Sequence, residues 1–346
     1  MVPDDGSEQL GRVLRFLGLA EGVSLRLMRK HRRILCAVPE ERDLALRTLG
    51  LYSPQRCAGR VAAAAVRAGI RAGRIRWVLP ESVDSPAGGG TLASCGVMLG
   101  SAGHQVERAV AVRPRATGIE VVKVAFGERG REILEGEAAM LRDPRVRRSG
   151  APELLGIESR DGGTALWMPW DEGAPYRNAE LGPVVSLLRA WTREGERRAL
   201  SEFEEGPLAM AELERRGVDA GRRERIASRP VAPALRHGDF ARWNLRLGPG
   251  GDLRVHDWER GRPEGPAGFD IVHYLVQEAL LVRRLPPRPL IRQVRQALSA
   301  PPVAEYLARA GWQGAEDDLI LGTVAFTTAA GYEDQSSLLR EMLATR

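Results

Sequence analysis

The chain has 346 residues, 43% of them hydrophobic, which is enough for two or three domains with buried cores. No apolar segment approaches the roughly 20 residues of a membrane-spanning helix, which excludes an integral helical membrane protein. The net charge is +6, and the excess lies in residues 1–170, which carry 26 basic and 19 acidic residues; residues 171–346 carry 25 and 26. No aromatic residues are interleaved with the basic ones for base stacking, so nucleic-acid binding is disfavoured.

Residues 1–85 alternate helical stretches with short apolar runs and predict a small α/β extension. The helical stretches are Glu41–Leu51 and Gln55–Ala72, and an apolar run covers Arg33–Val38. A basic run over residues 26–33 is typical of a solvated face, although it could also contact an acidic membrane surface or a polyanion.

The cysteines bear on the cellular compartment. Cys36, Cys57 and Cys95 are odd in number and too widely spaced for a zinc site. They predict reduced core thiols in a cytoplasmic protein.

Residues 97–112 predict two strands joined by a tight turn. Gly100, Ser101 and Gly103 lie in that turn, where small residues would let backbone amides approach a phosphate. The turn is not a Gly-x-Gly-x2-Gly loop, and an ordinary hairpin would have a similar sequence.

Lys123 is unusual because the chain has only two lysines among its 51 basic residues, the other being Lys30. It lies in the β-branched run Ile119–Phe126, whose alternation places Lys123 on one face with its neighbours two positions away. A compact ammonium suits a crowded phosphate site better than a guanidinium does. The alternative interpretation is a charge on an edge strand.

Two more elements follow before residue 170. Residues 131–141 have helical periodicity that turns Glu137 inward among apolar residues and leaves Glu132 and Glu135 at the surface. An apolar run over Thr164–Trp170 predicts a strand, which acidic and glycine residues follow.

The most informative segment is Arg236–Asn244, with the sequence Arg-His-Gly-Asp-Phe-Ala-Arg-Trp-Asn, followed by a turn and by Val255–Glu259. Phosphoryl transfer from a nucleotide needs an acceptor for the hydroxyl proton and oxygen ligands for magnesium. Asp239, Asn244 and Asp257 supply that set. Asp and Asn beside Gly are also common turn formers, so each residue alone would be read as structural. Their order and spacing together indicate function.

At these motifs the chain resembles the aminoglycoside phosphotransferase and choline kinase-like superfamily, whose pattern is His-Gly-Asp-x4-Asn followed by an Asp-Trp-Glu-like segment. The resemblance covers residues 90–346. It implies an α+β, two-lobed protein-kinase-like fold, with a strand-rich lobe over residues 86–170 and a mainly helical lobe over 171–346. Residues 1–85 lie outside it.

The resemblance also implies roles for the site residues. Asp239 would be the catalytic base or would orient the hydroxyl group, and Asn244 and Asp257 would be the Mg²⁺ ligands. Lys123, paired with Glu137, would contact the ATP phosphates, with Gly100, Ser101 and Gly103 covering them. Met168 and Trp170 would lie in the connector that contacts adenine. His237 would brace the loop backbone.

Helices predominate after about residue 176, and Asp270 is predicted to cap a helix over Ile271–Arg284. The acceptor would be a small molecule with a hydroxyl group, such as a sugar, amino sugar or amino alcohol. A cationic acceptor would need carboxylates, for which the candidates are Glu202, Glu204 and Glu205, or Glu333 and Asp334. These acids could equally be solvated helix faces. The alternative function is a nucleotide-binding regulatory or scaffold protein with little turnover, which the irregular phosphate loop and Arg242 favour.

Overall fold

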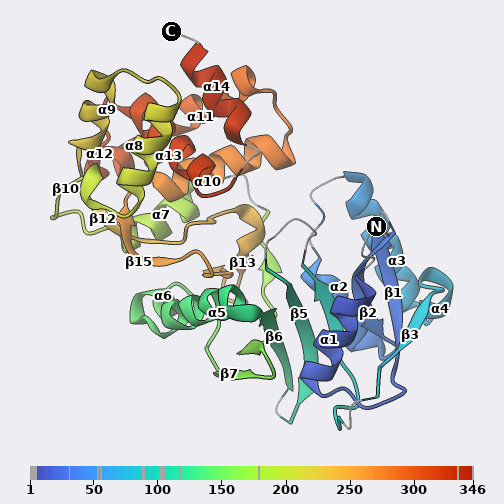
Figure 1. Cartoon of the computed structure of the whole chain (residues 1–346). Coiled ribbons are helices and arrows are strands. Elements are labelled where there is room, and N and C mark those ends of the chain that lie inside the picture. The colour runs from blue at the N-terminus through green and yellow to red at the C-terminus, as the bar shows by residue number, and fades with distance from the viewer. Residues whose placement is uncertain are drawn as a thin grey trace. The chain divides into compact units, whose positions relative to one another are not determined.

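The computed structural model describes residues 6–30, 32–52, 54, 57–87, 90–100, 106–116, 118–177, 180–332 and 335–344. The chain divides into two compact units, unit 1 with residues 1–142 and 152–172, and unit 2 with residues 143–151 and 173–346. The α+β class is confirmed, because unit 1 contains an eight-stranded sheet and unit 2 is mainly helical (Figure 1). Within the described ranges, none of the helices has the length and apolar character needed to cross a membrane.

Unit 1 is strand-rich. Its elements are α1 (Ser7–Leu17), β1 (Ser24–Lys30), β2 (Arg33–Pro39), α2 (Arg42–Leu51), α3 (Cys57–Arg71), α4 (Ile75–Val78), β3 (Ser82–Asp84), β4 (Gly96–Leu99), β5 (Arg108–Arg115), β6 (Gly118–Phe126), α5 (Gly127–Arg142), β7 (Gly156–Arg160) and β8 (Gly163–Pro169). The strand order in the sheet is β3-β1-β2-β4-β5-β6-β8-β7, and neighbouring strands are antiparallel. The strands of the first 85 residues therefore continue the same sheet as the later ones, through the pairing of β2 with β4.

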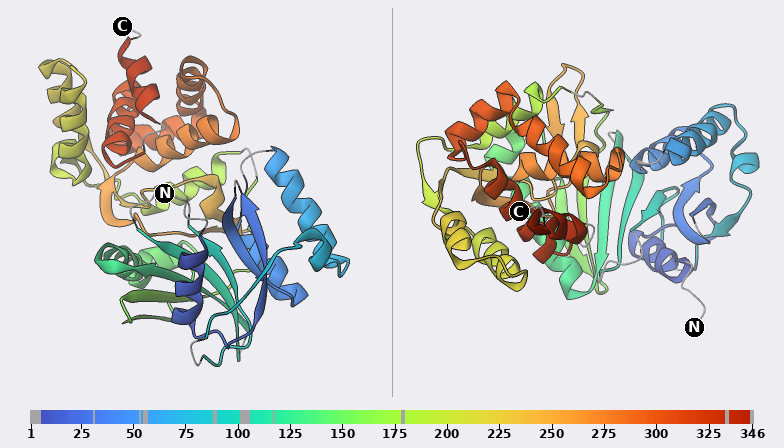
Figure 2. Two further views of the ribbon diagram at one scale, coloured as in Figure 1. Left: turned by 45° about the vertical axis from the view of Figure 1, so that its right-hand side comes forward. Right: turned by 90° about the horizontal axis from the view of Figure 1, so that it is seen from above.

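Apolar residues cover both faces of this sheet. On one face α1 contributes Leu10, Val13 and Leu14 to a core that includes Val122 and Val124 of β6. On the other face a second core joins α2 and α3 to the sheet (Figure 2). Its buried members are Cys36, Val38, Ala45, Leu49, Ile70 and Leu79. A strand with apolar residues on both faces reads as a nearly continuous apolar run, as β2 does.

The period of two along β6 separates these faces. Val122, Val124 and Phe126 pack on the core of α1, and Phe126 makes an edge-on contact with Phe16 of that helix. Lys123 and Ala125 have the opposite orientation, which is the side covered by α5. The predicted alternation in this run thus decides which helix Lys123 meets.

Unit 2 consists of helices with several short strands. Its elements are α6 (Pro144–Arg148), β9 (Ala174–Pro175), α7 (Gly182–Trp191), β10 (Arg198–Ala199), η1 (Leu200–Glu202), α8 (Glu205–Arg215), α9 (Ala220–Ala227), β11 (Pro230–Val231), β12 (Pro233–Arg236), η2 (Arg242–Asn244), β13 (Leu245–Leu247), β14 (Leu253–Val255), β15 (Arg262–Pro266), α10 (Phe269–Gln277), η3 (Glu278–Val282), α11 (Pro287–Leu298), α12 (Pro301–Ala310), α13 (Glu316–Ala329) and α14 (Ser336–Ala344). Figure 2 shows the helices gathered together, with the short strands beside them. The strands form three small sheets, β10-β11, β12-β15 and β14-β13-β9.

The thiols of Cys36 and Cys95 are buried and free, and burial raises the pKa of each to about 12. Because only the thiolate reacts readily, a raised pKa leaves almost no reactive form at pH 8. We expect both thiols to resist a chromogenic disulfide reagent at pH 8 in the native protein and to react at once in denaturant. The assay uses a Cys57→Ser variant, in which Cys36 and Cys95 are the remaining thiols. A rapid reaction of this variant with the reagent under native conditions would contradict the expectation.

Candidate active site

Unit 1 places an ammonium group against a carboxylate. Lys123 Nζ donates to both carboxylate oxygens of Glu137, at 2.7 and 2.8 Å. The Glu137 side chain is only 1% exposed and that of Lys123 is 15% exposed. A buried carboxylate that binds the ammonium with both oxygens fixes its position while leaving it partly accessible. Lys123 is thus held at a defined point on the sheet and remains partly exposed.

Of the residues predicted to cover phosphates, Gly100 is described and Ser101 and Gly103 lie outside the described residues. The Gly100 amide donates to the carbonyl of Arg108 at 2.8 Å, which closes the end of the β4–β5 pair. A Cβ atom at Gly100 would lie 2.9 Å from that carbonyl oxygen, so the close approach of the two backbones requires glycine.

Met168 and Trp170 lie at the end of β8. Met168 is 6% exposed. The Trp170 amide already donates to the carbonyl of Ile119 at 3.0 Å, and the guanidinium of Arg47 lies 5.5 Å from the centroid of the Trp170 ring. Within unit 1, the Trp170 amide is therefore already paired and its ring already contacts a guanidinium.

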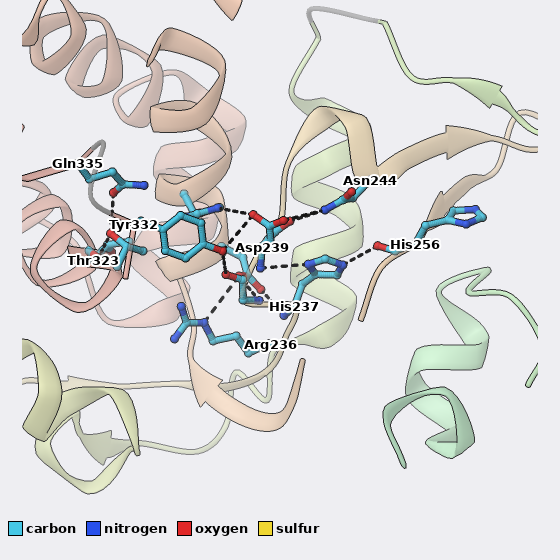
Figure 3. A network of polar contacts seen from close by, with 12 residues as sticks. Arg236, His237, Asp239, Asn244, His256, Thr323, Tyr332 and Gln335 are labelled. Carbon is cyan, nitrogen blue, oxygen red and sulfur yellow. Dashed lines mark hydrogen bonds and ion pairs between the residues drawn. The ribbon is translucent and has the colours of Figure 1, made fainter. Parts of the chain in front are cut away.

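In unit 2 the loop after β12 holds Asp239 and Asn244 together. Gly238 has φ 79°, and a Cβ atom there would lie 2.4 Å from the carbonyl oxygen of Arg260, so only glycine fits this turn. The loop then forms the single turn η2, which ends at Asn244. The side-chain nitrogen of Asn244 donates to the backbone carbonyl of Asp239 at 2.8 Å and to its carboxylate oxygen Oδ2 at 3.3 Å (Figure 3).

The segment with Asp257 is joined directly to this loop. The amide of His256 donates to the carbonyl of Asn244 at 2.8 Å, extending the β13–β14 pair by one residue. Asp257 comes next, with φ 66°. That value is uncommon for a residue other than glycine, and such backbone conformations cluster at functional sites. The predicted Asn244 and Asp257 are therefore brought together by backbone pairing.

The donor set around this point suits magnesium. Since the nitrogen of the Asn244 amide is directed to Asp239, its oxygen is the atom left to face a cation, and Asp257 adds a carboxylate. Mg²⁺ commonly takes one or two protein oxygen ligands and completes its shell with phosphates and water. In the described part of the chain there is no group of three or more His, Cys, Asp or Glu residues that could hold a metal on its own. Asn244 and Asp257 thus fit an ion that arrives with a phosphate ligand.

Buried aromatic residues pack against the loop and hold it in place. Phe240 and Trp258 are fully buried, and Trp191 contacts both rings at centroid distances of 5.5 and 5.3 Å. His237 also packs on Trp258, and its ring joins the two chain segments of the site: Nδ1 accepts from the Asp239 amide at 3.3 Å and Nε2 donates to the His256 carbonyl at 2.8 Å (Figure 3). His237 therefore braces the loop backbone.

Asp270 does not cap its helix, contrary to the prediction. The residue before α10 is Gly268, in the left-handed conformation and without a side-chain cap. The Asp270 carboxylate instead accepts from the amides of His237 at 2.8 Å and of Gly238 at 3.1 Å. The amides of His237 and Gly238 lie in a sharp turn and have no backbone carbonyl as hydrogen-bond partner in the described chain. The Asp270 carboxylate therefore binds them rather than the amides of its own helix. Asp270 thus holds the His237–Gly238 turn against α10.

We expect Asp270→Asn to destabilise unit 2. Only one atom of an amide can accept a hydrogen bond, so one of the two loop amides loses its partner, and the charge opposite Arg236 is lost (Nε to Oδ1, 3.7 Å). Loss of a buried hydrogen bond to a charged group costs about 1.5–3 kcal/mol in free energy of unfolding. Urea denaturation measures the change, with the exposed Asp252→Asn as the matched control. Equal midpoints for the two variants would contradict this role.

Two residues in contact with Asp239 were not predicted. His273 of α10 and Tyr332, which follows α13, both bind the Asp239 oxygen Oδ1, through Nε2 at 3.1 Å and through the hydroxyl at 3.2 Å. The sequence signal was faint: a histidine between apolar residues of a helix, three residues after Asp270. Neither residue lies near the loop in sequence.

Of the acidic residues considered for a cationic acceptor, Glu202 is exposed, Glu204 and Glu205 form ion pairs, and the other two lie outside the described ranges. Glu205 is buried and forms an ion pair of 2.6 Å with the buried Arg236, so it does not belong to a ligand-binding surface. Glu204 forms an exposed pair with Arg262 at 3.1 Å. Glu333 and Asp334 are outside the described residues.

In unit 1 the basic run over residues 26–33 is partly neutralised by ion pairs. Arg26 pairs with Glu40, and Arg29 pairs with Glu81.

Unit 2 thus provides the carboxylate of Asp239, the amide oxygen of Asn244 and the carboxylate of Asp257, on chain segments held by hydrogen bonds and aromatic packing. Unit 1 offers an ammonium fixed by a buried glutamate. The first set can accept a proton and hold a divalent cation, and the second can neutralise a phosphate.

No family model matches the chain, and no curated protein matches it in sequence. Solved structures are similar in fold. An aminoglycoside phosphotransferase from Streptomyces rimosus is 17% identical over 63% of this chain and 89% of its own, with a TM-score of 0.40. It has also been solved in complex with ADP and streptomycin.

Two other solved structures match the chain at similarly low identity. An aminoglycoside-3'-phosphotransferase of type VIII is 21% identical over 66% of this chain and 90% of its own, with a TM-score of 0.40. A choline kinase from Cryptosporidium parvum is 12% identical over 72% of this chain and 88% of its own, with a TM-score of 0.41.

Proposed function

We propose that this chain is a phosphotransferase that moves the γ-phosphoryl group of ATP to a hydroxyl group of a small molecule, in the manner of the superfamily that its motifs resemble. The observation that carries the proposal is the hydrogen-bonded arrangement of Asp239, Asn244 and the segment ending at Asp257. A loop that served only as a turn would not need a carboxylate, an amide oxygen and a second carboxylate joined by backbone pairing.

In this proposal Asp239 orients the acceptor hydroxyl and takes its proton as the new phosphate ester forms. Asn244 and Asp257 would hold Mg²⁺, which supplies charge neutralisation on the phosphates when bound. Lys123, fixed by Glu137, would contact the nucleotide phosphates, with Gly100, Ser101 and Gly103 near them. Met168 and the ring of Trp170 would contact adenine. Catalysis would rest on positioning and electrostatics.

We assign the reaction to residues 86–170 and 171–346, with residues 1–85 as an extension. The buried thiols of Cys36 and Cys95 suit a cytoplasmic protein. We infer that the acceptor is a sugar, an amino sugar or an amino alcohol.

The competing function is a nucleotide-binding scaffold with little turnover. Arg242 favours it, because members of the superfamily that the motifs resemble often carry proline at this position; here its guanidinium pairs with the buried Glu278 at 2.6 Å. The Lys123–Glu137 pair favours the enzyme, since a scaffold has no need of an ammonium held this tightly by a buried carboxylate.

The deciding experiment measures ADP release from ATP and Mg²⁺ by the purified full chain, across aminoglycosides, amino alcohols, monosaccharides and nucleosides. Acceptor-dependent release supports the phosphotransferase and identifies its acceptor class. Magnesium-dependent ATP binding without release for any acceptor supports the scaffold.

A further inference from the structure

The carboxylate of Asp239 is held by side chains that lie far from it in the sequence. His273 and Tyr332 both donate to Oδ1, at 3.1 and 3.2 Å, across 34 and 93 residues. Asn244 donates to the other oxygen, Oδ2, at 3.3 Å. In Figure 3 Tyr332 and Asn244 approach Asp239 from different sides. A carboxylate oxygen accepts about two hydrogen bonds, so Oδ1 is saturated whereas Oδ2 can accept one more.

These donors are themselves fixed. His273 is 1% exposed, and its ring meets the ring of Tyr332 edge-on, with centroids 5.1 Å apart and planes at 71°. The guanidinium of Arg260 lies 4.4 Å from the centroid of the Tyr332 ring. The turn that carries Tyr332 is closed by a hydrogen bond of 2.6 Å between Thr327 and Gln335. Side chains packed in this way hold one rotamer and lose little entropy when they bind.

Both groups are in the protonation state of a donor. His273 Nε2 lies 3.1 Å from a carboxylate oxygen, which can only accept, so Nε2 carries a proton; Nδ1 is buried and has no hydrogen-bond partner among the described residues. Burial and the nearby Asp239 charge raise the pKa of Tyr332 well above its ordinary value, so its hydroxyl keeps its proton.

We propose that His273 and Tyr332 are positioning residues that fix the side-chain rotamer of Asp239 by holding Oδ1, so that Oδ2 faces the acceptor hydroxyl. The inference rests on the proposed function. In the transfer step the acceptor oxygen bonds to the γ-phosphorus, the bond from that phosphorus to the bridging oxygen of ADP breaks, and the hydroxyl proton passes to Oδ2. The donors on both oxygens therefore orient the carboxylate before transfer.

The first test separates kcat from KM in full-length variants. Tyr332→Phe keeps the ring and loses only the hydroxyl, and His273→Leu removes the Nε2 donor. We expect each to lower kcat about ten- to a hundredfold, the effect of one hydrogen bond to a charged group, and to leave KM for ATP unchanged. His273→Gln restores a donor on a side chain of similar reach and should recover most of the lost kcat.

The matched control is Tyr306→Phe, which removes another buried tyrosine hydroxyl from unit 2. That hydroxyl accepts from the Gly268 amide at 3.1 Å and has no contact with Asp239 in the described chain. We expect this variant to keep kcat within about twofold while its melting temperature falls as much as that of Tyr332→Phe. A kcat of Tyr332→Phe and His273→Leu that matches the control would overturn the positioning role.

A second measurement does not depend on activity. Nitrogen-15 NMR of the five histidines, with His273 assigned by its loss in His273→Gln, reports which ring nitrogen carries the proton. We expect the proton on Nε2 in the wild type and a shift of that signal in Asp239→Ala. An Nε2 without a proton, or no shift, would overturn the contact. If the wild type shows this signature but no acceptor is phosphorylated, the proposed function fails and the geometry around Asp239 stands.

Discussion

Asp239→Asn should lower the rate of phosphoryl transfer about 10²- to 10⁴-fold, the range for loss of a positioned general base. The amide keeps the size of the carboxylate but cannot take the hydroxyl proton. It also places an N–H group where Asn244 donates to Oδ2, or where His273 and Tyr332 donate to Oδ1. The acceptor hydroxyl would then lose both its proton acceptor and its orientation.

Nucleotide affinity should change little in this variant, because Asp239 is not assigned to the phosphates or to the metal ion. The measurements are kcat by coupled ADP assay and Kd for ATP with Mg²⁺ by calorimetry. Asp252→Asn, at an exposed turn of the same unit, is the control for a lost negative charge. Weaker nucleotide binding with unchanged turnover would reassign Asp239 from chemistry to binding.

Lys123→Met should lower kcat/KM for ATP about 10²- to 10³-fold, the typical effect of removing one group that stabilises developing charge. Methionine keeps the length of the side chain on β6 but removes the ammonium that Glu137 binds with both oxygens. Lys123→Arg should fail nearly as badly, since a planar guanidinium does not fit the position of an ammonium beside a buried carboxylate.

The chain provides a matched control, because its only other lysine, Lys30, is exposed at the end of β1. Lys30→Met should keep wild-type kinetics. A melting temperature recorded for each variant separates loss of nucleotide contact from unfolding of unit 1. If Lys123→Met kept full activity, the Lys123–Glu137 pair would be a structural ion pair only.

The pairing of Lys123 with Glu137 was implied by the family resemblance, whereas the sequence pattern alone predicted only the direction of each side chain. A period of two on β6 and of 3.6 on α5 decides which face each side chain takes, whatever the rest of the chain does. The relation of Asp239 to Asn244 is also local, since one loop carries both. The facing of a side chain thus follows from local periodicity, and the motif and the resemblance supplied the partner.

The contacts of Asp270, His273 and Tyr332 could not be anticipated in this way. Asp270 has the sequence position of a helix cap, yet its carboxylate meets amides 32 and 33 residues earlier in the chain. Tyr332 reaches Asp239 across 93 residues. These contacts depend on how helices pack in unit 2, which periodicity does not determine. A polar residue between apolar residues of a helix, as His273 is, indicates that the side chain has a hydrogen-bond partner, but the sequence does not identify that partner.

The pairing of β2 with β4 has a consequence for how unit 1 folds. A chain cut at residue 86 would expose the backbone edge of β4 and remove the apolar residues that α1, α2 and α3 pack on the sheet. An uncovered edge next to exposed core residues is a template for aggregation. The first 85 residues and the rest of unit 1 therefore gain their stability jointly and should unfold in one cooperative transition.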